Sequence, residues 1–101
     1  MATVYVSLGP VGSRGKNDSV GTFVGDRLRA ETITSSGTTA KGALTSNGRE
    51  FAKVFCATAI YANAGPLATA TVSATTGVHI PAGTYEYIGL SDGQVIAVID
   101  A

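Results

Sequence analysis

The sequence has one cysteine, one histidine and no tryptophan among its 101 residues. A single cysteine excludes a disulfide within the chain, although small secreted domains usually need such bonds. Cys56 and His79 together supply too few ligands for a zinc site, so we expect neither a metal nor a cofactor. The chain also lacks an apolar run that resembles a signal peptide or could span a membrane. It is therefore expected to fold in a reducing cytoplasm.

Charge is scarce as well, because charged residues make up 14% of the chain and the formal net charge is zero. A neutral chain is not typical of a general nucleic-acid-binding protein. All seven basic residues nevertheless lie within residues 1–53, while residues 54–101 contain acids and no base. Chance clustering on solvated loops would explain this equally well. The alternative is that basic N-terminal loops contact an acidic partner surface, and the candidates are Arg14, Lys16, Arg27 and Arg29.

Leucine, lysine and glutamate are few, whereas the chain has 13 glycines and many threonines and valines. This composition favours strands over helices. Residues 2–8 alternate between apolar and polar side chains, as a strand with one wet face does. Strong turn signals recur at 46–48, 63–66, 81–83 and 91–93. We therefore predict an all-β fold, a single-domain antiparallel β-sandwich or barrel with long N-terminal loops.

The two halves of this single domain, residues 1–101, are expected to differ. Residues 1–50 are predicted to be loop-rich and partly projecting, because 9–26 contain many glycines and 27–45 form two short polar strands around a turn. Residues 51–101 are predicted to supply the core strands. They begin with a long apolar strand at 50–62 and continue with one or two strands at 67–80.

The glycine-rich stretch LGPVGSRGKND, residues 8–18, could suggest a phosphate-binding loop. Such a loop requires G-x-x-x-x-G-K-[S/T] between a strand and a helix. Here the first glycine is replaced by Pro10, and the hydroxyl residue after Lys16 is replaced by Asn17. We therefore expect a basic surface loop and no nucleotide binding.

No set of residues has the pattern of a catalytic site. Cys56 lies within an apolar strand and is expected to be buried and unreactive. His79 is isolated, Asp92 belongs to a turn signal, and Glu86 lies between two tyrosines. The sequence predicts a protein that is not an enzyme.

The C-terminal stretch QVIAVI is apolar on both of its alternating faces. Asp92-Gly93 before it predicts a hairpin that pairs residues 84–90 with 94–100. One face can pack in the domain core, but the other requires a second cover. Residues 27–45 are too polar to cover it well, so we expect a subunit contact in a homo-oligomer, with a trimer favoured. Its candidates are Tyr85, Tyr87, Ile96 and Val98.

The second half of the chain resembles small structural proteins of tailed bacteriophages. The resemblance lies in Ile80-Pro81-Ala82-Gly83, Tyr85-Glu86-Tyr87, Gly93 and the closing Ile96-Ala97-Val98-Ile99. Head decoration (cement) proteins fit best. These are compact β domains, often trimeric, that bind major capsid subunits, which implies a place on the capsid surface after assembly in the host cytoplasm. Another virion component of the neck, tail or fibre base is the alternative, and a surface- or sugar-binding β module is a weaker one, since tryptophan is absent.

Overall fold

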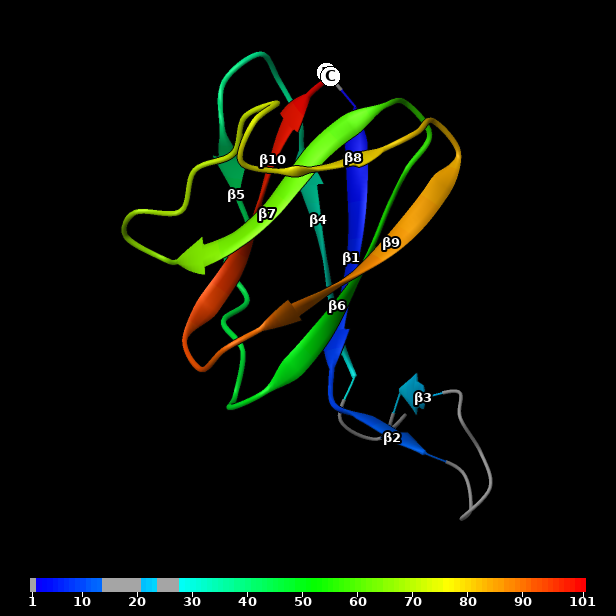
Figure 1. Ribbon diagram of the computed structural model, residues 1–101, viewed down its shortest axis with the longest axis vertical. Coiled ribbons are helices and arrows are strands. Elements are labelled where there is room, and N and C mark those ends of the chain that lie inside the picture. The colour runs from blue at the N-terminus through cyan, green and yellow to red at the C-terminus, as the bar shows by residue number, and fades with distance from the viewer. Residues whose placement is uncertain (1, 14–20, 24–27) are drawn as a thin grey trace.

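The computed structural model describes residues 2–13, 21–23 and 28–101, and these form a sandwich of two antiparallel four-stranded sheets (Figure 1). The first sheet has the order β4-β1-β6-β9, with β4 at Arg29–Thr34, β1 at Thr3–Gly9, β6 at Glu50–Cys56 and β9 at Thr84–Leu90. The second has the order β5-β10-β7-β8, with β5 at Ala40–Lys41, β10 at Gln94–Asp100, β7 at Ile60–Pro66 and β8 at Val78–Ile80. The predicted all-β, single-domain sandwich is confirmed.

The core lies between the two sheets and follows the period-two alternation of the strands. Val4, Val6 and Leu8 of β1 point inward and are at most 1% exposed. They pack with inward side chains of β6 and of the second sheet, among them Val54, Cys56, Ile60, Ile96 and Val98. Burying one valine or isoleucine side chain fully is worth ~1.5–3 kcal/mol. Burial of these inward apolar side chains is therefore the main contribution to the stability of the fold.

The first half of the chain contributes more to the core than the sequence suggested. β1 is a central strand that pairs with both β4 and β6. Residues 28–45 do form two strands around a turn, but β4 joins the first sheet and β5 joins the second. Ile33 of β4 is 5% exposed and belongs to the core cluster. Residues 28–45 therefore do not project, contrary to expectation, because β4 pairs along β1 and Ile33, Ala40 and Leu44 pack in or against the core.

Part of the segment expected to be loop is also paired. β2 (Val11–Ser13) and β3 (Gly21–Phe23) form a separate two-stranded antiparallel ribbon. This ribbon lies beyond one end of the sandwich, below β1 in the view of Figure 1. Among the described residues of 1–50, this ribbon is the part that lies beyond the sandwich.

The apolar stretch 50–62 is two strands and not one. β6 ends at Cys56, the chain crosses to the other sheet over residues 57–59, and β7 begins at Ile60. A continuous strand of this length would span ~43 Å and run far past the end of β1. Crossing over instead buries Cys56 and Ile60 on opposite walls of one core. The turn expected at 63–66 is absent, because these residues continue β7, which ends at Pro66.

The C-terminal turn is present, but the hairpin prediction was wrong. Gly93 has φ of +79°, which favours glycine, and the Gln94 amide donates to the Ser91 carbonyl oxygen over 3.2 Å. The strands on either side nevertheless pair with different partners, β9 with β6 and β10 with β7 and β5. A tight turn can connect strands of two sheets as well as neighbours in one. β10, apolar on both faces, takes an internal position in the second sheet.

The outward face of β10 is covered by the chain itself. Val95 and Ala97 are both 0% exposed and pack against Ala70 and Val72 of the connection between β7 and β8. Neighbouring strands hold this connection in place. Lys41 of β5 donates to the Leu67 carbonyl oxygen over 2.8 Å, and the Asn63 side-chain amide of β7 donates to the Thr71 carbonyl oxygen over 3.2 Å.

This cover corrects the predicted subunit contact. Ile96 and Val98 are 1% and 0% exposed and belong to the core of a single chain, so neither can contact another subunit. The sequence predicted strand for residues 67–80, but only Val78–Ile80 is a strand, and residues 67–77 form this connection, in which about half of the side chains are polar. Close packing compensates for this, since a Cβ at Gly77 would lie 2.5 Å from a methyl group of Val72.

Cys56 is buried, as predicted, and it is a free thiol at 0% exposure. We expect native protein to react with a thiol reagent many-fold more slowly than protein unfolded in denaturant, because reaction requires the sandwich to open. Cys56→Ala should lower the free energy of unfolding by about 1–2 kcal/mol through the small cavity it leaves. Labelling followed by mass spectrometry measures the first effect and urea unfolding the second. Rapid labelling of the native protein would contradict the burial.

Candidate functional site

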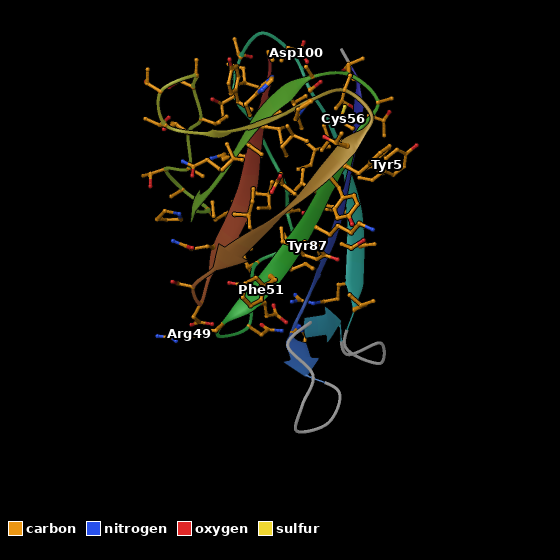
Figure 2. The ribbon with its side chains drawn as sticks, turned by 45° about the vertical axis from the view of Figure 1, so that its right-hand side comes forward. Tyr5, Arg49, Phe51, Cys56, Tyr87 and Asp100 are labelled. Carbon is orange, nitrogen blue, oxygen red and sulfur yellow. The ribbon has the colours of Figure 1, made fainter. Side chains whose placement is uncertain are left out.

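The outward side of the first sheet carries a group of exposed aromatic side chains. We call it the aromatic face and define it by five aromatic residues with a lysine among them, namely Tyr5, Phe51, Lys53, Phe55, Tyr85 and Tyr87. Figure 2 shows Tyr5 projecting away from the ribbon, with Tyr87 and Phe51 drawn nearer its centre. No described segment covers this side, in contrast to the outward face of β10.

The register of the strands brings these residues together. Tyr5 of β1 lies opposite Phe55 of β6, which lies opposite Tyr85 of β9. Lys53 lies opposite Tyr87 in the next outward row. Residues directly opposite each other in neighbouring strands share one face of the sheet. Three strands from distant parts of the chain therefore place their aromatic residues side by side.

The rings contact one another while remaining open to solvent. Tyr5, Phe51, Tyr85 and Tyr87 are between 43% and 54% exposed. The ring centroids of Tyr5 and Phe55 are 6.4 Å apart, and those of Tyr85 and Tyr87 are 5.7 Å apart with nearly perpendicular ring planes. The contact between Tyr85 and Tyr87 is edge-to-face, which is a favoured arrangement of aromatic rings. The rings of the aromatic face therefore contact one another in pairs.

A third outward row ends in a glycine. Phe51 lies opposite Gly89 of β9, and a Cβ at Gly89 would lie 3.6 Å from the Phe51 ring. An aromatic ring that covers a glycine on a neighbouring strand protects the backbone there. Phe51 thus packs across β9 and still presents 43% of its surface to solvent.

Two shallow hollows flank the aromatic face. One, of about 370 Å³, lies beside Tyr5 between β1 and β4 and is lined by Ser7, Ala30 and Thr32 among others. The other, of about 380 Å³, lies at the opposite end beside Phe51 and Gly89. Both are open surface depressions.

The charge on this surface is positive. Among the described outward residues of the first sheet, Lys53 is the one that carries a charge. Its ammonium nitrogen lies 4.3 Å from the centroid of the Tyr85 ring, which is cation–π geometry. Glu86 of β9 occupies an inward position opposite Val54, so its carboxylate does not belong to the face.

Of the four predicted basic contact residues, the structure describes Arg29. Arg14, Lys16 and Arg27 lie outside the described residues. Arg29 has an inward position on β4, where its guanidinium pairs with the Glu50 carboxylate and donates to the Thr45 carbonyl oxygen over 2.8 Å. The Glu50 side chain is 6% exposed. Arg29 therefore connects β4 to the segment that leads into β6.

Of the predicted subunit-contact residues, Tyr85 and Tyr87 lie on the aromatic face, whereas Ile96 and Val98 lie in the core. Sequence reasoning missed Tyr5, Phe51, Lys53 and Phe55 as members of one site. The available signal was their place at odd-numbered positions of predicted strands. That signal is not sufficient without the order of the strands, which joins β1, β6 and β9.

Within the described part of the chain, no group of three or more histidine, cysteine, aspartate or glutamate side chains could hold a metal ion. No helix of the described residues is long and apolar enough to cross a membrane. Comparisons with models of protein families, with curated proteins and with solved structures found no match. The aromatic face is the feature of the described residues that points to a function.

Proposed function

We propose that the chain is a non-enzymatic structural protein of a tailed-bacteriophage virion, a decoration (cement) protein that binds major capsid subunits through its aromatic face. The observation that carries the proposal is the contrast between the two sheets. Residues 67–77 cover the second sheet, while no described segment covers the outward aromatic residues of the first sheet. The resemblance of residues 80–99 to phage structural proteins supports the choice of partner.

The size of the aromatic face is consistent with a protein interface. Each aromatic side chain offers ~150–250 Å², so the four that are about half exposed, Tyr5, Phe51, Tyr85 and Tyr87, present on the order of 400 Å². The largest apolar patch on a monomeric protein is commonly of this size and is often functional. A specific interface buries ~800 Å² on each partner, and the two flanking hollows and the threonines of β4 extend the surface toward that value.

A sugar-binding module is the second candidate, and the exposed tyrosines favour it. Ring orientation argues against it, however. The Tyr85 and Tyr87 planes are 87° apart, and Lys53 lies over one face of Tyr85. A sugar that stacks on a platform needs rings presented flat and uncovered. Protein side chains can interlock with perpendicular rings, so we favour a protein partner.

The proposal extends to assembly and location. The protein would fold in the host cytoplasm and act on the outer surface of the capsid. A homotrimer remains a prediction, and Ile96 and Val98 no longer support it, because the chain buries both. A neck, tail or fibre-base protein is the alternative within the virion, and genes for tail proteins beside that of the chain would favour it.

The experiment measures binding to empty shells assembled from the major capsid protein of the phage genome that carries the gene for this chain. Tyr85→Ser combined with Phe51→Ser should weaken binding roughly 10- to 100-fold, as loss of interface hot-spot residues does. Leu67→Ser is the matched control, because Leu67 is 48% exposed but follows β7 in the second sheet. Equal weakening by the control, or no shell binding by the native chain, would contradict the proposal.

A further inference from the structure

We infer that the partner surface presents a carboxylate to Lys53 within a ring of apolar side chains, and that this partner is a different protein and not a second copy of the chain. The inference rests on the proposed function, since it specifies the chemistry of the surface that the aromatic face binds. Its basis is the position of Lys53, the one cation among the described outward residues of the first sheet, which include no anion.

Lys53 lies near the middle of the aromatic face. Phe51 and Phe55 flank it along β6, and Ser7 and Tyr87 lie opposite it on the neighbouring strands. Its ammonium group contacts the Tyr85 ring and forms no ion pair with a described carboxylate. The lysine is therefore held in place before binding, with its hydrogen-bond donors available to an incoming group.

A partner that covers the aromatic residues must also cover this ammonium. Removing a charge from water without a counter-charge is costly, whereas a well-placed opposite charge restores the balance. A partner that is apolar throughout would leave Lys53 buried and unpaired. A partner with a carboxylate at this point would bind more tightly and in one orientation. Charge complementarity thus selects an acidic group surrounded by apolar ones.

A second copy of the chain does not meet this requirement. Two copies that join through the same face are related by a two-fold axis, so each residue near the centre approaches its own equivalent. Lys53 would then approach Lys53 of the other copy, and the described outward positions of the sheet contain no acid to separate them. Self-association through the aromatic face is therefore disfavoured, and any homo-oligomer would form through another surface.

Single-stranded nucleic acid is a poorer fit than an acidic protein surface. Aromatic residues and a cation are features of such sites, but these sites also need a positive groove that follows several phosphates. The aromatic face offers one lysine at its centre, with Arg49 exposed beyond its end.

The test uses the intact chain and the capsid shells described above, with binding measured at low and raised salt. Lys53→Met retains the apolar stem without the charge and is expected to weaken binding about tenfold or more and to reduce the salt dependence. Lys53→Arg should stay within a few-fold of the native chain, because arginine also pairs with carboxylates and stacks on tyrosine. Lys41→Met, the same change on the second sheet, is the control and should have little effect.

The outcomes separate the inference from the proposed function. If the native chain binds shells and the Tyr85/Phe51 variant does not, but Lys53→Met binds like the native chain, the carboxylate inference is wrong and the function stands. If the native chain does not bind shells, both fail. In sedimentation of the chain alone, we expect no dimer that forms through the aromatic face. Such a dimer would be recognised because Tyr85→Ser dissociates it. Such a dimer, or Lys53-dependent binding of a labelled oligothymidylate, would replace the inferred partner and overturn the inference.

Discussion

Replacing Arg29 with alanine is expected to lower the free energy of unfolding by about 2–4 kcal/mol. Arg29 neutralises Glu50, whose side chain is 6% exposed at the start of β6. The same carboxylate accepts a hydrogen bond from the Asn47 amide over 2.8 Å, and Arg29 also donates to Thr45. Without Arg29, Glu50 keeps one backbone donor and loses its counter-charge. The 30% exposure of the Arg29 side chain keeps the expected loss below that of a fully buried pair.

Arg49 provides a matched control for this prediction. It precedes Glu50 directly in the chain, but it is exposed, and Glu50 pairs with Arg29 instead. Arg49→Ala should therefore leave the urea midpoint nearly unchanged, whereas Arg29→Ala should lower it clearly. Glu50→Gln should fall between the two, because an amide oxygen still accepts from Asn47 and needs no counter-charge. Equal midpoints for the Arg29 and Arg49 variants would show that the pair does not stabilise the sandwich.

Replacing Ile96 with alanine should lower the free energy of unfolding by about 2–5 kcal/mol. Ile96 is 1% exposed and packs in the core between the two sheets. The substitution removes three carbon atoms and leaves a cavity that the paired strands β10 and β7 cannot close easily. Because the contacts lie within one chain, the urea midpoint of the variant should not depend on protein concentration.

The dependence on concentration separates this explanation from the predicted subunit contact. Stability that comes from association rises with protein concentration, whereas stability from an internal core does not. Val78→Ala is the control, because Val78 is 45% exposed at the edge strand β8 and should matter little. If the urea midpoint of the native chain depends on protein concentration and Ile96→Ala removes that dependence, Ile96 lies in a subunit interface. That result would contradict its burial within one chain.

Much of the local structure could be predicted because it depends on near neighbours in the chain. The alternation in residues 2–8 correctly separates inward Val4 and Val6 from outward Tyr5. Asp92-Gly93 correctly predicts a tight turn, since glycine tolerates the positive φ found at position 93. The burial of Cys56 also follows from its apolar strand. Each of these features is decided by the side-chain period or the backbone preference of a few consecutive residues.

The sequence by itself thus determined that the chain forms strands, where most of them turn and which side of β1 is buried. The tertiary structure alone decided which strands pair, and with them the site. β9 pairs with β6 and not with β10, residues 67–77 cover β10, and Tyr5, Phe55 and Tyr85 meet across three strands. Pairing depends on how all apolar faces can be buried together, which no single stretch encodes. The aromatic face is exposed because residues 67–77 pack on the second sheet, while no described segment packs on the outward side of the first.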